Sequence, residues 1–221
     1  MNDWPGFFVT FEGIEGSGKT SHANRLWRFL TEQGIHCILT REPGGTALGE
    51  KLREILLNPA TENIDGVTEV LLFAASRCEH VRKVIVPALQ AGRVVICVRY
   101  VDSTLAYQGY GRKIPLSFLT FLNEVVVGKV LPELTFLLDV EPEAGIKRSI
   151  SKTCKEELRF EEEFLQHEEL LEEIRKGYLA IAADNPERFC VISTTWLPKE
   201  DVFEYIKNEF WRRFQERRVK A

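Results

Sequence analysis

The segment GIEGSGKT, residues 13–20, limits the folds open to this chain more than any other feature. It matches the pattern G-x-x-x-x-G-K-[ST], in which glycines let backbone N–H groups turn inward around a phosphate. An apolar run at 7–13, FFVTFEG, precedes the segment, and a helical pattern over 19–33 follows it. This strand–loop–helix context argues against a chance glycine-rich turn and predicts a phosphate-binding loop (P-loop) that uses the helix N-terminus.

The loop predicts an ATP site with Mg²⁺. Its residues are Gly13, Ile14, Glu15, Gly16, Ser17, Gly18, Lys19 and Thr20. We expect Lys19 to reach the β- and γ-phosphates and the Thr20 hydroxyl to bind Mg²⁺. The pattern alone does not separate a switch GTPase, a motor and a small kinase. The base-reading N-K-x-D of GTPases is absent from the sequence, and the short chain with arginine-rich loops favours a kinase with a small acceptor.

Strand-length apolar runs alternate with helical patterns along the whole chain. We predict strands at 7–13, 93–100, 134–140 and 188–194, and a strand that runs into a Gly-Pro loop at 36–45. We predict helices at 19–33, 47–57, 66–90, 115–127, 142–152, 161–183 and 199–217. Such alternation predicts βαβ units and an α/β, three-layer P-loop NTPase fold, with a parallel five-stranded sheet flanked by helices. The polar residues after the third strand, up to 109, are interpreted as a loop.

No repeat, linker or shift in composition divides the chain, so we expect a single P-loop kinase domain over 1–221. The polar segment at about 149–163, SISKTCKEELRFEEE, is the least globular stretch. It is either a solvent-exposed helix pair or a small lid. Both interpretations stay open at this point.

Composition argues against several partners. With 29 Lys and Arg against 33 Asp and Glu, the net charge of −4 gives no reason to expect nucleic acid. The basic C-terminal FWRRFQERRVKA is better explained as a solvated helix than as a nucleic-acid or membrane surface. Without a membrane-length apolar window or a secretory pattern, we expect a cytoplasmic protein.

The cysteines and histidines do not point to a metal site. The five cysteines lack a C-x-x-C pair, which predicts reduced, buried thiols. The four histidines show no ligand spacing, so we expect them on surfaces or helix faces.

Three arginines point to a phosphorylated acceptor. Arg41 in TREPGG and Arg99 in VRY directly follow predicted strands, where α/β sheets bind ligands, and Arg77 lies in a predicted helix. A single such arginine is more often part of a surface ion pair. Three of them in a P-loop protein favour phosphate and base binding.

These pieces together resemble the thymidylate kinase family, P-loop enzymes that transfer the γ-phosphoryl group of ATP to dTMP and give dTDP for dTTP synthesis. The segments that carry the resemblance are FEGIEGSGKT, TREPGGT followed by GEKLREILL, LLFAASRCEHV, VRYVDSTLAYQG, LDVEPE, and RFEEE with the later GYLAIA. They run in family order over nearly the whole chain.

The resemblance implies roles for particular residues. Arg41 and Arg99 are expected to hold the dTMP phosphate, and Phe73 to stack on thymine, although its VLLFAA context also fits simple core packing. Arg77 is expected to hydrogen-bond thymine O4, an acceptor that cytosine replaces with a donor. Tyr107 resembles the aromatic residue beside the deoxyribose that disfavours a 2′-hydroxyl.

Further positions follow from the same resemblance. Ser103 and Gln108 match acceptor-pocket positions, and Glu15 is similar to the P-loop acid that meets the dTMP 3′-hydroxyl and the Mg²⁺ shell. Family members are homodimers, and the apolar helical segment 67–81 is the expected contact.

The catalytic cation is one departure from the family's usual pattern. Members with a P-loop arginine supply the transition-state cation there, whereas GIEGS has none. The resemblance therefore implies lid cations, with Arg148 and Arg159 as the main candidates and lysines at 152 and 155 beside them.

Val98 is the other departure, because it stands where the family's D-R-Y motif begins with an acid. One interpretation is an active enzyme in which Glu15, Glu12 or water takes over the role. The alternative is a dTMP- and ATP-binding homologue with reduced or lost turnover. A kinase for an unphosphorylated deoxynucleoside is a third, which the phosphate-binding arginines oppose.

Overall fold

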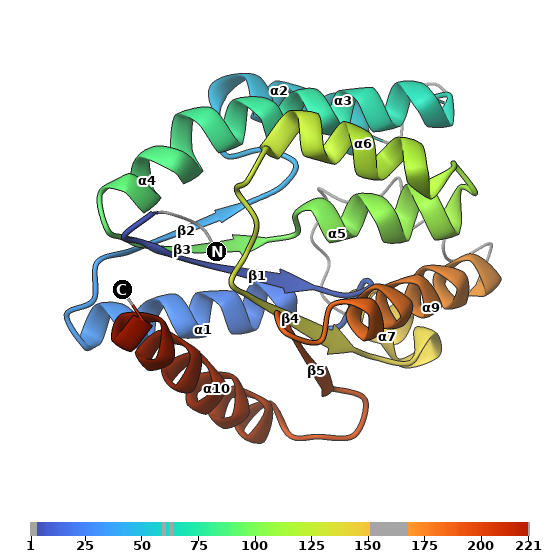
Figure 1. Cartoon of the computed structure of the whole chain (residues 1–221). Coiled ribbons are helices and arrows are strands. Elements are labelled where there is room, and N and C mark those ends of the chain that lie inside the picture. The colour runs from blue at the N-terminus through green and yellow to red at the C-terminus, as the bar shows by residue number, and fades with distance from the viewer. Residues whose placement is uncertain (1–3, 59–60, 62–63, 151–167, 221) are drawn as a thin grey trace.

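A parallel five-stranded sheet organises the structure, a computed structural model that describes residues 4–58, 61, 64–150 and 168–220 (Figure 1). The strands are β1 (Phe7–Glu12), β2 (Cys37–Arg41), β3 (Val94–Val98), β4 (Leu134–Asp139) and β5 (Phe189–Ser193), in the order β2-β3-β1-β4-β5. Every pairing in the sheet is parallel. This confirms the predicted fold, with each strand somewhat shorter than the apolar run that predicted it.

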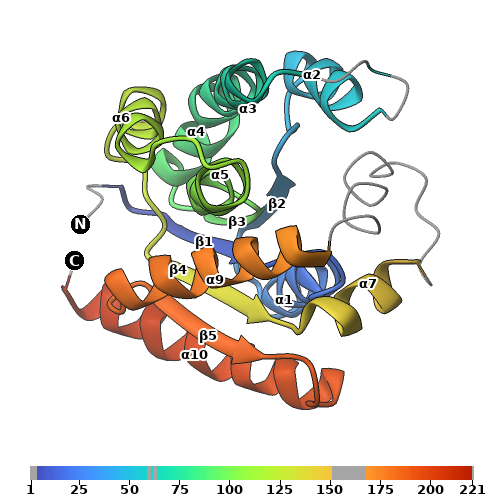
Figure 2. The same ribbon diagram turned by 90° about the vertical axis from the view of Figure 1, so that its right-hand side faces the viewer.

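Helices cover both faces of the sheet. They are α1 (Lys19–Glu32), α2 (Ala47–Leu57), α3 (Gly66–His80), α4 (Val86–Gln90), α5 (Val101–Thr104), α6 (Leu116–Val127), α7 (Pro142–Ile150), α9 (Glu168–Asp184) and α10 (Lys199–Lys220). A π-helical segment, η1 (Val81–Ile85), joins α3 to α4, so the predicted helix over 66–90 is continuous. Helices α1 and α10 lie on one face, and α3, α4 and α6 lie on the other (Figures 1 and 2).

Alternation along the strands decides which side chains meet which helices. Phe7, Val9 and Phe11 of β1 join the apolar cluster that contains residues of α1 and α10. Phe8 joins the cluster on the opposite face, with Tyr100. Because successive side chains of a strand point to opposite faces, Glu12 falls on the Phe8 face and the P-loop begins at the carboxyl end of the strand.

The interpretation of the segment up to residue 109 as a loop is wrong. Helix α5 follows β3 almost directly and continues into a π-helical segment, η2 (Leu105–Gly111). Tyr107 and Gln108 therefore follow Ser103 on one helical path, four and five residues later, and all three side chains line the same pocket. The polar composition reflects that these side chains line a site rather than that the backbone is irregular.

The remaining expectations have mixed outcomes. The expected lid lies outside the described residues, apart from the end of α7. Four described cysteines are free, but only Cys97 is fully buried, so the expectation of generally buried thiols is wrong. His80 lies in α3, one of the helix positions expected for histidines, and is buried between Glu42 and Thr40. In the part of the chain that the structure describes, no helix is long and apolar enough to cross a membrane.

Candidate active site

The P-loop lies between β1 and α1, as the sequence predicts. Gly16 has a φ of 69°, a left-handed conformation that favours glycine. A Cβ atom at this position would lie 2.0 Å from the carbonyl oxygen of Gly145 in α7, so the loop and α7 touch backbone to backbone. No side chain fits at position 16 unless α7 moves. This agrees with a P-loop that carries no arginine of its own.

Lys19 and Thr20 occupy the first turn of α1. The Lys19 amine donates to the Ile14 carbonyl at 2.7 Å and lies 3.4 Å from Ser17 Oγ, so it curls over the loop whose bound phosphates it is expected to contact. Thr20 is exposed. Its hydroxyl is accessible at a helix N-terminus, where the backbone N–H groups favour anions.

The residues present suit a Mg²⁺ ion that is carried in by a nucleotide. Within the described residues, no group of three His, Cys, Asp or Glu side chains is placed to hold a metal ion by itself. Mg²⁺ usually keeps several waters and takes one or two protein ligands plus substrate phosphates. The Thr20 hydroxyl, with Glu15 in the same loop, meets that requirement.

Arg99 connects the P-loop to the wall of a neighbouring pocket. One of its terminal nitrogens, Nη2, donates to Glu15 Oε1 at 2.6 Å and to the Tyr107 hydroxyl at 2.9 Å. The other, Nη1, lies 3.4 Å from Ser103 Oγ. Its φ of 67° is unusual for a residue other than glycine and costs about 1–2 kcal/mol. Such strain is found mostly where surrounding contacts hold a functional group in place.

Glu12 supports this arrangement from beneath. Its buried carboxylate accepts hydrogen bonds from the Tyr100 backbone N–H at 2.7 Å, Ser103 Oγ at 2.7 Å and the Tyr178 hydroxyl at 3.0 Å. Burial, and after it the negative charge of Asp102, raises the pKa of Glu12 to about 7. Sequence reasoning gave Glu12 no such structural role, because the three donors come from segments far apart in the chain.

Val98 lies on the other face of the sheet from Glu12. It is 8% exposed and belongs to the apolar cluster that contains Phe11 and Ala23. The carboxylate of Glu12 therefore does not replace the acid expected at position 98. Of the two acids considered from the sequence, Glu15 is the one in the P-loop itself.

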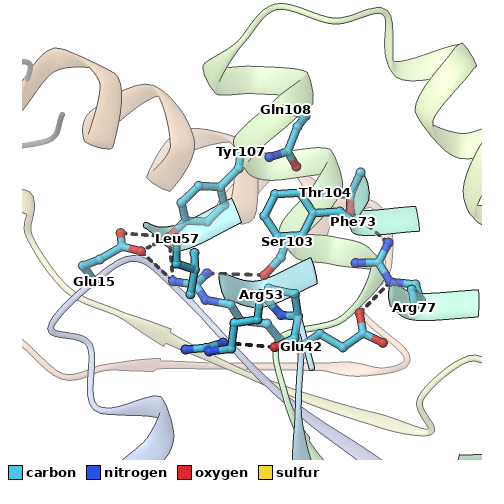
Figure 3. A pocket seen from close by; sticks show the side chains of 12 residues that line it. Glu15, Glu42, Arg53, Leu57, Phe73, Arg77, Ser103, Thr104, Tyr107 and Gln108 are labelled. Atoms are coloured by element: carbon cyan, nitrogen blue, oxygen red, sulfur yellow. Dashed lines mark hydrogen bonds and ion pairs between the residues drawn. The ribbon is translucent and has the colours of Figure 1, made fainter. Parts of the chain in front are cut away.

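A pocket that is partly open to solvent lies beside Arg99. Its lining residues are Glu15, Glu42, Pro43, Arg53, Leu57, Phe73, Arg77, Arg99, Ser103, Thr104, Tyr107 and Gln108. Figure 3 shows Glu15 and Arg77 at opposite ends, with Tyr107 and Ser103 between them. The structure thus brings together all of the predicted acceptor-site residues except Arg41.

Arg77 is fixed by other protein groups at the far end of this pocket. Its Nε donates to Glu42 Oε2 at 2.7 Å, and its terminal nitrogens donate to Thr104 Oγ1 at 2.9 Å, Asn123 Oδ1 at 2.9 Å and the Tyr100 carbonyl at 3.0 Å. Burial alone would raise the pKa of Glu42, but the Arg77 charge holds it below its usual value. These bonds use four of the five guanidinium donors, which leaves one for a ligand.

Arg41 does not line the pocket. Its side chain is 47% exposed and pairs with Glu50 at 2.9 Å. Arg53 of α2 lines the pocket instead, with Nη1 donating to the Pro43 carbonyl at 3.0 Å. A sequence signal existed for Arg53: it lies four residues after the buried Gly49 and three before the buried Leu56, so an arginine interrupts the buried stripe of an amphipathic helix.

The expected lid cations are largely untested by the structure. Arg148 Nη2 donates to the carbonyls of Thr194 and Thr195 at 3.0 and 2.8 Å, and Arg148 does not line the pocket. Arg159, like the two lysines between it and Arg148, lies outside the described residues. The source of a transition-state cation stays a prediction.

Comparisons with known proteins agree with this site. The family model described as thymidylate kinase matches residues 11–206. A thymidylate kinase of Oleidesulfovibrio alaskensis is 47% identical over 206 residues, covering 91% of this chain and 95% of that protein. One of Maridesulfovibrio salexigens is 44% identical over 205 residues, covering 90% and 93%. The crystal structure of thymidylate kinase from Ehrlichia chaffeensis superposes with a TM-score of 0.75 at 35% identity, covering 93% of this chain and 98% of that one.

Proposed function

The chain belongs to the thymidylate kinase family, and we propose that it binds dTMP in the pocket beside Arg99 and ATP on the P-loop, and transfers the γ-phosphoryl group between them. The observation that carries this assignment is the position of Arg99. It bonds to Glu15 of the P-loop and to Tyr107 and Ser103 of the pocket wall. A phosphate held by this guanidinium lies next to the loop that holds the other nucleotide.

Two arginines of the described residues suit the phosphate end of the pocket. Arg99 and Arg53 both line it, and a guanidinium fork suits a phosphate dianion well. We assign the phosphate-binding role to these two residues rather than to Arg41. Because an uncharged acceptor needs no such pair, they also argue against a deoxynucleoside kinase.

The sugar and base fit the remaining lining. The Tyr107 hydroxyl donates to the Glu15 carboxylate at 2.8 Å, and these two side chains would lie beside the deoxyribose of the bound nucleotide. Phe73 offers its ring for stacking, and Arg77 offers its fifth donor to a carbonyl at position 4 of the base. This order puts the phosphate near the P-loop and the base at Arg77, the two ends of the pocket in Figure 3.

Catalysis then consists of positioning and charge stabilisation. Arg99 and Arg53 orient the attacking phosphate oxygen, which is already an anion and needs no general base. Lys19 contacts the β- and γ-phosphates and follows the charge as it moves to the leaving group. Thr20, with Glu15 beside it, would hold Mg²⁺, and the ion would supply charge neutralisation. Arg159 remains our candidate for a further cation.

The alternative of a binding homologue without turnover is not supported over this assignment. The relatives at 44% and 47% identity are thymidylate kinases, and the expected acceptor-site residues other than Arg41 line one pocket. Val98 bears on the rate of phosphoryl transfer, because the D-R-Y motif of the family has an acid at this position.

We also propose a homodimer through α3 and α6. Phe121 and Val125 of α6 are 64% and 61% exposed, and Val67 and Leu71 of α3 are exposed as well. Figures 1 and 2 show α3 and α6 side by side in the outer layer. Adjacent exposed apolar side chains of this size often mark a protein interface. Sedimentation of wild type and Phe121→Lys tests this, because the substitution should yield monomers and an unchanged mass would contradict it.

A coupled assay of ADP release tests the function itself. With ATP and Mg²⁺, dTMP should support turnover, dUMP should be a weaker acceptor, and dCMP and thymidine should be poor. Saturable dTMP binding without ADP release would favour the binding homologue. Thymidine turnover above that of dTMP would favour a deoxynucleoside kinase.

A further inference from the structure

The side-chain amide of Gln108 has one orientation fixed by a buried carboxylate. Its Nε2 donates to Glu69 Oε1 at 2.9 Å, and Glu69 in the first turn of α3 is fully buried. An ionised carboxylate only accepts hydrogen bonds. The reverse orientation would set the amide oxygen against it, so Gln108 Oε1 must face away from Glu69.

Glu69 has a positive partner in this position. Arg112, four residues after Gln108, approaches Glu69 Oε2 with Nη2 at 3.4 Å. A buried carboxylate is costly unless it is paired with a cation and hydrogen-bonded. Arg112 therefore compensates the burial of Glu69 and helps to hold its carboxylate beside the Gln108 amide.

The Gln108 amide oxygen is available to a ligand. Gln108 lines the pocket, and within the described residues no hydrogen bond to its Oε1 is present. Figure 3 shows Gln108 above Ser103 and Phe73, between Tyr107 and Arg77. The pocket wall thus presents an acceptor from Gln108 and a donor from Arg77.

This pair of groups matches one class of pyrimidine. A 4-keto pyrimidine has an O4 acceptor next to an N3–H donor, whereas cytosine has an amino donor next to an N3 acceptor. A site that leaves polar groups unpaired against the wrong base rejects it strongly. With the amide reversed, Gln108 and Arg77 would present two donors, which match neither base fully.

We propose that Glu69 is a positioning residue that sets base selectivity by fixing the Gln108 amide with its oxygen toward the base. Glu69 itself does not line the pocket and acts only through Gln108. The proposal rests on the proposed function, since it takes dTMP as the acceptor. It adds a residue outside the pocket to those that choose the base.

The test substitution is Glu69→Gln, which keeps the size of the side chain and removes its one-way acceptor character. The new amide accepts or donates, so Gln108 adopts both orientations. A hydrogen bond to a charged group is worth about 1 kcal/mol more than a neutral one, so the ratio of kcat/KM for dTMP to that for dCMP should fall about threefold to tenfold. A fall of both kcat/KM values by the same factor, with an unchanged ratio, would mean a merely structural role and overturn the proposal.

A double-mutant cycle with Gln108→Ala tests whether Glu69 acts on base selectivity through Gln108. In the Gln108→Ala background, Glu69→Gln should change the ratio of kcat/KM for dTMP to that for dCMP by less than about twofold, because the coupling between the two contacting residues is lost.

Asp102→Asn is the matched control. Asp102 is also fully buried and paired with an arginine, Arg188, but does not line the pocket. It should lower stability and leave the base ratio unchanged. An equal effect of Glu69→Gln in both backgrounds would contradict the proposal.

A measurement on the wild-type protein covers the case in which the Glu69 variant does not fold. The Nε2 hydrogens of Gln108, assigned by NMR against Gln108→Ala, should include one that exchanges slowly and shifts little when dTMP is added. A large dTMP-induced shift of that hydrogen would put the amide nitrogen toward the base and overturn the proposal. If wild type does not phosphorylate dTMP at all, the proposed function fails, which these readouts distinguish from a failure of the Glu69 assignment alone.

Discussion

Replacing Val98 with aspartate should raise the rate of phosphoryl transfer while lowering stability. Val98 is the last residue of β3, paired in register with Phe11 just before the P-loop, and its isopropyl group is 8% exposed. It points into the layer between the sheet and α1, whose N-terminus carries the P-loop. A carboxylate there approaches the loop from the face that Glu12 does not serve.

The two effects have different sizes. Loss of the buried valine side chain and partial desolvation of the new carboxylate should lower the free energy of unfolding by about 3 kcal/mol in total. For a chain of this size that corresponds to a fall in Tm of roughly 6–12 °C. If a carboxylate at this position organises Mg²⁺ and the phosphoryl oxygens, kcat should rise tenfold or more, on the order of 1.4 kcal/mol in the barrier.

The assay is the initial rate of ADP release at saturating ATP and dTMP, with Mg²⁺ varied, below the Tm of the variant. Val98→Asn is the control, because it matches aspartate in shape but lacks the charge; it should lose stability without gaining rate. A folded Val98→Asp protein with the wild-type kcat would show that a carboxylate at this position does not organise Mg²⁺ and the phosphoryl oxygens. So would a Val98→Asn protein that gains as much.

Three further perturbations test the site. Burial raises the pKa of Glu12 from 4.5 to about 7, so between these pH values the folded protein keeps a proton that the unfolded chain releases. The free energy of unfolding of wild type, measured in urea and compared with Glu12→Gln, should therefore fall by about 3 kcal/mol as the pH rises from about 4.5 to about 7. Parallel pH curves of the two proteins would contradict this. Gly16→Ala should lower kcat by about a hundredfold or more, because the new Cβ atom meets the Gly145 carbonyl. Gly34→Ala is the control, because Gly34 has a similar φ of 75° but open space around it. This variant should lose only about 1 kcal/mol of stability and keep its full kcat. Arg53→Met should raise the KM for dTMP about tenfold or more with the KM for ATP unchanged, and Arg41→Met should leave both within about twofold; the reverse order would restore the sequence-based assignment.

The order of layers was predictable because it depends on local pattern. Apolar runs long enough for strands alternated with helical patterns, and the P-loop fixed where the first strand had to end. Phe73, Tyr107 and Gln108 came from the family resemblance and do line the pocket. The segment from Val101 to Gly111 was misjudged because polar side chains on a helix that faces a site have the composition of a loop.

Other features depend on which segments meet in space. Arg41 is the last residue of β2, at the strand end where a ligand is expected, yet it pairs with Glu50 in the first turn of α2. Arg53 reaches the pocket only because α2 lies over it. The bonds that Glu12 accepts from Tyr100, Ser103 and Tyr178 join residues up to 166 positions apart, and no local pattern predicts them.

The most direct test of the proposed dTMP kinase function concerns Arg99, because this function requires Arg99 to hold the acceptor phosphate next to the P-loop. The measurement is kcat/KM for dTMP and for thymidine in wild type, Arg99→Lys and Arg99→Met, with folding verified by circular dichroism. Wild type should strongly prefer dTMP. Arg99→Met should lose about two to three powers of ten in kcat/KM for dTMP and little for thymidine, with Arg99→Lys between the two. Equal losses for both acceptors, or an unchanged kcat/KM for dTMP in Arg99→Met, would show that Arg99 does not hold the acceptor phosphate.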